Sequence, residues 1–273
     1  MLNKRMRSKL ISLGWIVISL CVLNPTKLIA QDTTTAVQDT TIVKSKWHFL
    51  LEPYIMFPNM HGTTGLGGLP NAQVDEDPGD IFSNLQFGAM IYAEAIKGFW
   101  TFSSDLTYMK LKSNVSAKNE VVSGSAELEQ LAWEIAGMRK LAPWFELGLA
   151  FQLNHIKSDV DLFINTSGGR EERTSKIDES WVDPSILTRV KFDLSKKWFF
   201  QFRGNLGGGG IGSDLYWQLQ SYFGYRFSKL FQLSAGYRVI YIDYETGSGN
   251  DRFVYDMTTF GPVLRFGFNL GKF

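Results

Sequence analysis

The sequence predicts an all-β protein, a transmembrane antiparallel β-barrel of about ten strands, with eight or twelve strands as the alternatives. Residues 198–273 contain several runs, each roughly ten or more residues long, in which polar and apolar residues alternate. The connections between such runs are alternately short and long along the chain. In lipid only a closed sheet gives every backbone group a partner, so the strands are expected to form a cylinder.

The N-terminal residues 1–30 have the features of a secretory signal peptide. Residues 10–23 form a short apolar run, which is preceded by a cluster of basic residues. A transmembrane helix is the competing interpretation, but the run is too short to span a bilayer. The basic residues are Lys4, Arg5, Arg7 and Lys9.

Cys21, the single cysteine, lies inside this apolar run. A lipoprotein signal would have a small residue just before its cysteine, whereas this chain has Leu20. The mature chain is therefore expected to lack cysteine, and with it any disulfide or thiolate chemistry. Residues 31–46 are rich in Thr, Asp and Val without a period, which indicates a disordered periplasmic lead-in.

The barrel is predicted to occupy residues 47–273. In each expected strand one face is apolar, and the other carries Gln, Arg, Glu or Gly. The pattern is strict at residues 144–155, where Phe145, Leu147 and Leu149 alternate with Glu146 and Gly148. The expected strands are 47–57, 85–96, 99–111, 126–139, 144–155, 181–192, 198–206, 215–227, 231–244 and a last strand after residue 251.

The connections predict which side of the membrane each end of the barrel faces. Outer-membrane barrels have short periplasmic turns and longer extracellular loops, and both of their termini are periplasmic. Every connection in this chain fits that rule. The short turns are at 97–98, 140–143, 193–197 and 228–229, and the long loops are at 58–84, 113–125, 157–179, 207–212 and 245–251.

Aromatic residues recur where the strands meet the short turns, which is typical of an aromatic girdle at a membrane interface. Trp181 and Trp217 are expected toward the opposite rim. The residues of the girdle beside the short turns are Trp47, Phe99, Trp100, Trp144, Trp198 and Phe231.

Charged residues in the inward phase divide by sign along the chain. The strands up to residue 155 contribute acids to the lumen, and the later strands contribute bases. A narrow barrel is filled by its side chains, and buried charges must be paired because an unpaired one costs several kcal/mol. The predicted lumen network is Glu52, Glu94, Asp105, Glu134, Glu146, Arg189, Lys191, Arg203, Arg226, Arg238 and Arg265.

Two functions remain open for such a lumen. The charges could form a salt-bridge network that plugs the barrel and gives it a structural role. Alternatively, they could create a transverse field across a narrow, wet, passive channel that admits small polar solutes.

The loop at 58–84 contains an acidic cluster that could bind a divalent cation through hard oxygen ligands. It lacks the spacing of an EF-hand, so a solvated acidic loop is the competing interpretation. A surface-binding protein that uses its acidic extracellular loops is therefore one alternative function. The acidic residues are Asp75, Glu76, Asp77 and Asp80.

His61 and His155 are expected at the outer rim near acidic residues, which makes a rim-located outer-membrane hydrolase a second alternative. No local motif marks either histidine, so no catalytic residue is assigned. The glycines at 207–210 are not followed by a helix and are not expected to bind phosphate.

The composition narrows the set of partners. The formal net charge of +1 gives no support for nucleic-acid binding. No cofactor or metal is expected. The expected partners are the lipid of the outer membrane and the barrel-assembly machinery, with small polar solutes as the cargo of a channel.

Several segments resemble those of a broad group of small outer-membrane β-barrel proteins of Gram-negative bacteria. The resemblance covers nearly all of the mature chain and implies the barrel fold, but no defined activity. The signal end Leu-Ile-Ala-Gln at 28–31 resembles those of Bacteroidetes. The segments are Glu-Pro-Tyr-Ile at 52–55, Asp-Ile-Phe-Ser-Asn-Leu at 80–85, Gly-Gly-Gly-Ile-Gly-Ser-Asp at 208–214 and Gly-Tyr-Arg-Phe at 224–227.

Overall fold

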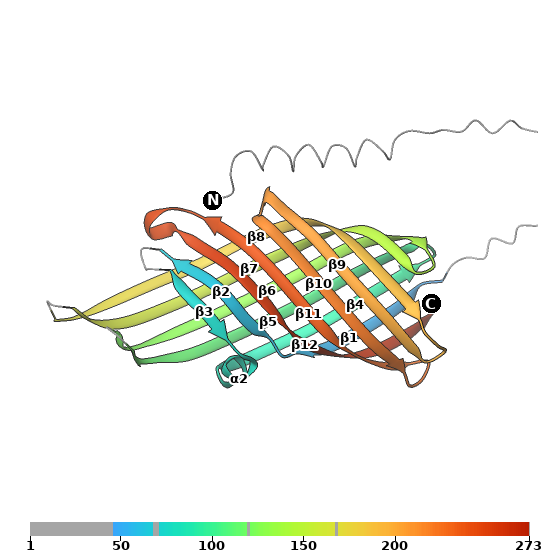
Figure 1. Ribbon diagram of the computed structural model, residues 1–273, viewed down its shortest axis with the longest axis horizontal. Helices are drawn as coiled ribbons and strands as arrows, with labels where there is room; N and C mark the ends of the chain where they lie inside the picture. Colours follow the sequence, from blue (N-terminus) through green and yellow to red (C-terminus); the bar gives the residue numbers. More distant parts are fainter. Residues whose placement is uncertain (1–45, 68–70, 119–120, 167–168, 273) are drawn as a thin grey trace, which may run out of the picture. The chain divides into compact units, whose positions relative to one another are not determined.

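A computed structural model of the chain describes residues 46–67, 71–118, 121–166 and 169–272 (Figure 1). The predicted signal peptide and nearly all of the predicted lead-in lie outside these ranges. The described elements are β1 (His48–Met56), β2 (Asn59–Leu66), β3 (Ala72–Glu76), α2 (Pro78–Ser83), β4 (Leu85–Lys97), β5 (Trp100–Lys118), β6 (Val121–Ala142), β7 (Phe145–Thr166), β8 (Gly169–Asp193), β9 (Trp198–Ile211), β10 (Ser213–Arg226), β11 (Phe231–Thr246), the 3-10 turn η1 (Gly249–Asp251) and β12 (Phe253–Lys272).

The strands form one antiparallel sheet that closes on itself. Its order runs from β1 through β4 and then consecutively to β12, and β12 pairs back with β1. Strands β2 and β3 are additional, so ten of the twelve strands make the closed ring. The predicted ten-stranded transmembrane barrel is confirmed, and its fold is that of an outer-membrane β-barrel.

Strands β1 and β2 act as one long strand along β12. Met56 is the last residue of β1 to pair with β12, and the pairing resumes at Asn59 of β2. Across the break, the Phe57 amide donates to the Pro262 carbonyl at 2.9 Å. On its other side β1 pairs with β4 only from His48 to Pro53. Beyond Pro53 the two strands separate, and the barrel wall is interrupted there.

The short helix α2 lies where β1 and β4 separate. Its capping box pairs the Asp80 amide with the Asp77 carboxylate at 3.0 Å and the Asp77 amide with the Asp80 carboxylate at 3.4 Å. Ile81 is buried inside, whereas Phe82 is exposed and contacts the ring of Phe57 edge-on. The loop expected at 58–84 therefore contains β2, β3 and α2.

Two other predicted loops are wrong, because they are extensions of strands. Residues 113–125 and 157–179 belong mostly to the hairpins β5–β6 and β7–β8, which project beyond the other strands (Figure 1). Cross-strand ion pairs such as Lys112 with Glu127, at 2.5 Å, line the outward face of the β5–β6 extension. The sequence there looked like a loop because the outward face has become polar.

The outer surface carries a broad apolar band, as a barrel in lipid requires. No helix within the described ranges is long and apolar enough to cross a membrane. Trp181, predicted toward the rim opposite the short turns, is buried in the lumen, where it stacks on Tyr244 at 4.1 Å between ring centroids. Exposed members of the band include Phe102, Ile135, Leu149, Ile186, Leu206, Leu219, Phe223 and Leu270.

Aromatic side chains gather at the end of the barrel with the short turns, here called the tight-turn end; the opposite end is the long-hairpin end. Phe99, Trp100, Trp144 and Trp198 are all exposed beside these turns. Trp144 stacks on Phe192, with 6.0 Å between the ring centroids. This arrangement matches the predicted girdle.

Phe199 is buried in the lumen toward the tight-turn end, and its ring lies directly over Gly224. A Cβ on Gly224 would be 2.1 Å from the Phe199 ring. Gly224→Ala is therefore expected to destabilise the folded barrel by about 1–3 kcal/mol through overpacking. Gly137→Ala is the matched control, because its Cβ would meet only Phe102, at an ordinary 3.8 Å. Urea unfolding in lipid vesicles measures both, and equal stabilities would contradict this packing.

Candidate functional site

The lumen has two chemically different parts. Toward the tight-turn end lies a set of buried charged side chains, called here the charged zone. Toward the long-hairpin end the lumen is lined by apolar and aromatic side chains, called here the apolar zone. The charged zone is Glu52, Glu94, Asp105, Glu134, Glu146, Arg189, Arg203, Arg238 and Arg265. The apolar zone is Met60, Ile81, Met109, Ile156, Ile177, Trp181, Tyr216, Ile242, Tyr244, Phe253, Tyr255 and Met257.

Arg189, on β8, joins two walls of the charged zone. Its Nε donates to Glu146 Oε2 of the neighbouring strand β7 at 2.6 Å. Its guanidinium also pairs with Glu94 of β4, across the lumen. Tyr92 donates to the same Glu94 carboxylate. One arginine therefore pairs with two buried carboxylates, which gives each of them a cationic partner.

Arg203, on β9, crosses the lumen to Glu134 of β6. Both side chains are almost completely buried, and they form an ion pair. The other Glu134 oxygen accepts from Asn205 Nδ2 at 2.7 Å, and Arg203 Nη1 donates to Tyr92 Oη at 3.3 Å. This pair spans the lumen from β9 to β6.

Arg265, on β12, lies among three tyrosines. Its guanidinium is 5.0 Å from the ring of Tyr54, 4.7 Å from that of Tyr92 and 4.2 Å from that of Tyr222. Stacking of a desolvated cation on aromatic faces adds to its ion pairs. Those pairs are with Glu52 at 3.5 Å and with Asp105 at 3.7 Å.

Arg238 and Asp105 complete the charged zone. Arg238 Nη1 lies 3.4 Å from Asp105 Oδ2, and its Nε and Nη2 donate to Gln218 Oε1 at 3.1 and 2.7 Å. Tyr54 connects the two, because it donates to Asp105 at 2.6 Å and accepts from Arg238 at 2.9 Å. Ion pairs and hydrogen bonds thus link facing walls throughout the charged zone.

The two remaining residues of the predicted network, Lys191 and Arg226, lie at the mouth of the tight-turn end. Lys191 Nζ and the Arg226 guanidinium lie over the Phe199 ring at 5.2 and 4.8 Å. Arg226 also pairs with Asp193 at 2.6 Å, and the Asp193 side chain is largely exposed. Arg226 therefore belongs to a half-exposed mouth rather than to the buried cross-lumen network.

The four predicted acidic loop residues have different structural contacts and do not converge on one site. Asp75, on β3, faces His61 at 3.5 Å, and Asp77 and Asp80 cap α2. Burial, together with repulsion from Asp80, Asp77 and Asp75, raises the pKa of Glu76. No three of the described acidic, histidine or cysteine side chains are grouped so that they could hold a metal ion.

The two predicted rim histidines do not form a serine–histidine–aspartate relay. His155 Nδ1 lies 2.8 Å from Ser180 Oγ and 3.7 Å from Asp178 Oδ1. A serine–histidine–aspartate relay needs the serine and the carboxylate on different ring nitrogens, whereas both approach Nδ1 here. His61 has a largely exposed side chain on β2.

Sequence reasoning missed the apolar zone and Asp183. Asp183 is fully buried on β8, where it accepts the Ser213 amide at 2.6 Å and Trp181 Nε1 at 3.0 Å. The missed signal is a change in the alternation along a strand, from polar residues inside and apolar residues outside to the reverse. On β5 Met109 and Leu111 point inward, while the residue between them, Lys110, takes part in an ion pair outside.

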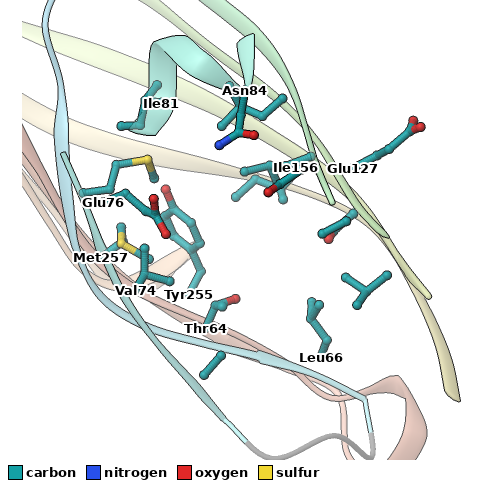
Figure 2. Close-up of a pocket in the computed structure, with 18 of the residues that line it drawn as sticks. Thr64, Leu66, Val74, Glu76, Ile81, Asn84, Glu127, Ile156, Tyr255 and Met257 are labelled. Carbon is teal, nitrogen blue, oxygen red and sulfur yellow. The ribbon is translucent and has the colours of Figure 1, made fainter. Parts of the chain in front are cut away.

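The apolar zone contains a pocket of about 450 Å³, lined mainly by carbon (Figure 2). Its walls come from β2, β3, α2, the β5–β7 extensions and β12. Beneath it lies a smaller cavity of about 60 Å³, which shares Met60, Tyr255 and Met257 with the pocket and reaches down to Arg238. On the other side of the charged zone, at the tight-turn mouth, a cavity of about 240 Å³ is bordered by Glu146, Arg189 and Lys191.

Removal of Arg203 tests whether the charged zone stabilises the barrel as paired charges. Arg203→Leu leaves Glu134 buried without its cation and is expected to destabilise the barrel by about 3–5 kcal/mol. The double variant Glu134→Leu/Arg203→Leu is expected to regain most of this loss, because a well-packed apolar pair replaces the ion pair. Urea unfolding in lipid vesicles, followed by tryptophan fluorescence, measures both.

Arg252→Leu is the control for this test. Arg252 pairs with Glu245 at 2.9 Å in a partly exposed position. An exposed pair contributes about 0–1 kcal/mol, so this variant should keep nearly full stability. A double variant as unstable as Arg203→Leu alone would contradict the pairing.

Comparison with known proteins does not assign the chain to a family. No family model matches the sequence, and no curated protein matches it. Among solved structures, the outer membrane protease OmpT from Escherichia coli is similar, with 8% identity over 84% of this chain and 98% of that chain, and a TM-score of 0.49.

Two other similar structures are barrels of different kinds. The toluene transporter TbuX of Ralstonia pickettii has 7% identity over 84% of this chain and 90% of that chain, with a TM-score of 0.38. The Neisserial surface protein A has 15% identity over 82% of this chain and 95% of that chain, with a TM-score of 0.30. At these scores, functional reasoning rests on the residues of this chain.

Proposed function

We propose that this protein is a non-enzymatic outer-membrane β-barrel whose lumen is closed by the charged zone. The tight-turn end faces the periplasm and the long hairpins face outside, following the signal peptide expected at residues 1–30. The observation that carries the proposal is the set of ion pairs that cross the lumen, Arg189 with Glu94 and Arg203 with Glu134.

The charge balance of the zone favours a plug over a pore. Five carboxylates face four arginines, and Lys191 at the mouth brings the formal sum to zero. A pore that selects ions through charged side chains keeps those charges in contact with water. The charged side chains of this zone are each less than a tenth exposed, and each has an ion-pair partner within the zone.

The free space within the charged zone also favours closure. A cavity bordered by Glu52, Glu94 and Arg265 measures about 10 Å³. A cavity needs roughly 10–15 Å³ to hold a water molecule, so this space holds about one. Hydrated ions and polar solutes need a continuous wet path, which the packed side chains interrupt.

Conductance in a planar lipid bilayer tests the proposal. The refolded wild-type barrel, with its fold verified by heat-dependent migration in an SDS gel, is expected to produce no discrete current steps. The triple variant Tyr92→Ala/Arg203→Ala/Arg265→Ala removes large buried side chains from the charged zone and is expected to conduct. Arg252→Ala, a single truncation at the long-hairpin end, should remain silent.

The wild-type measurement decides the question even if the triple variant does not fold. Discrete, ion-selective steps from the wild-type barrel would overturn the plug and favour the narrow channel. Steps from Arg252→Ala alone would show that the barrier lies at the hairpin end rather than in the charged zone.

A further inference from the structure

The pocket in the apolar zone has the size and the lining of a site for a small molecule. Its volume of about 450 Å³ lies within the range of roughly 300–1,000 Å³ that is usual for ligand pockets. Figure 2 shows Ile81 and Asn84 on one side of it, Thr64, Leu66 and Val74 on another, and the ring of Tyr255 projecting into it. Apolar side chains from distant parts of the chain thus surround an open space.

The charged side chains at the pocket are all acidic. Glu127 pairs with Lys112 at 2.5 Å, and Figure 2 shows its carboxylate directed away from the pocket. Asp80 is held by the cap of α2. Among the described residues that line the pocket, none is lysine, arginine or histidine. A carboxylate ligand such as a fatty acid would find no cation there and would meet Glu76.

The sheet is interrupted beside the pocket, because β3 and β5 are not paired with each other. In the described part of the chain β3 pairs with β2 and with no second strand, and β4 meets β5 only up to Leu85 and Leu111. The pocket is lined from both sides of this gap, by Ala72 and Val74 of β3 and by Leu111 and Ser113 of β5. A ligand can therefore enter sideways, beneath the projecting hairpins.

Methionine side chains contribute to the floor of the pocket. Of the eight methionines in the chain, only Met1 and Met6 precede the described residues. Five of the others line the small cavity beneath the pocket. Unbranched thioether side chains adapt to ligands of different shape, so this floor can yield to a longer chain. The five are Met56, Met60, Met90, Met109 and Met257.

We propose that the apolar zone binds an uncharged apolar molecule, such as a medium-chain alcohol or hydrocarbon, that enters through the gap between β3 and β5. The charged zone closes the path below, so the pocket is blind and the site binds rather than conducts. Burial of the ligand's hydrocarbon surface supplies the affinity. The binding site stands whether or not the lumen below it conducts.

Two ligands of equal length test the class of molecule. Decan-1-ol and decanoate are titrated by calorimetry into the full barrel in lipid nanodiscs, with the heat from empty nanodiscs subtracted. At about pH 8, where decanoate is ionised, decan-1-ol is expected to bind saturably and about tenfold or more tightly than decanoate. Equal affinities would overturn the preference for an uncharged ligand.

Two adjacent residues on β6 provide matched variants for the location. Ala126 lines the pocket, while Ser125 alternates to the outward face of the same strand. Ala126→Trp fills the pocket and is expected to weaken decan-1-ol binding about tenfold or more. Ser125→Trp adds the same ring outside and should leave the affinity within about twofold.

Heat-dependent migration in an SDS gel checks that both variants fold. Equal decan-1-ol binding by Ala126→Trp and Ser125→Trp would place the ligand outside the pocket and overturn the proposal. So would wild-type heats that match partition into empty nanodiscs. Conductance of the same preparations separates these outcomes from a failure of the lumen plug.

Discussion

The structure depends on the neutralisation of charge inside a narrow closed sheet. A cylinder of ten strands leaves little room for water, so each guanidinium or carboxylate in its lumen needs a partner within reach. Arg265 satisfies this requirement with two carboxylates and three tyrosine rings. Arg203 satisfies it with a single carboxylate on the facing wall. These contacts join the walls of the barrel at one level of the lumen.

Above that level the barrel changes its chemistry on both faces. Within the lipid band the outward side chains are apolar and the lumen is polar. In the hairpin extensions the outward side chains include Lys112 and Glu127, and the lumen is lined by residues such as Leu128 and Ile156. The change follows from the solvent, because outside lipid the outer face meets water. The inner face can then be apolar and form a core, which here is incompletely filled.

The incomplete filling has an identifiable cause in the wall. Strand β4 leaves β1 at Pro53, and the space between them is occupied by α2 and the β2–β3 hairpin rather than by paired strands. Ile81 of α2 packs inward, and Phe82 contacts Phe57 on the other side. A helix of six residues seals less of the wall than a strand pair would. The pocket lies beside this irregularity, between β3 and the extensions of β5–β7.

The sequence by itself determined the barrel, its ten strands and the inward phase of its charged residues. A residue period of two is a local property, and lipid on one side makes it easy to recognise. The alternation of short and long connections likewise follows from chain order alone. For these reasons Glu94, Arg189 and Arg203 were assigned to the lumen before the structure was considered.

Only the tertiary structure decided which charges meet and where the lumen is hollow. Glu94 and Arg189 are 95 positions apart in the chain, and their contact depends on the curvature and stagger of the closed sheet. Residues 113–125 and 157–179 resembled loops because their polar residues face water on the outside of the extended hairpins. The sequence also did not predict the pocket. Leu128 and Ile156 face the same space only because the closed cylinder brings their strands together.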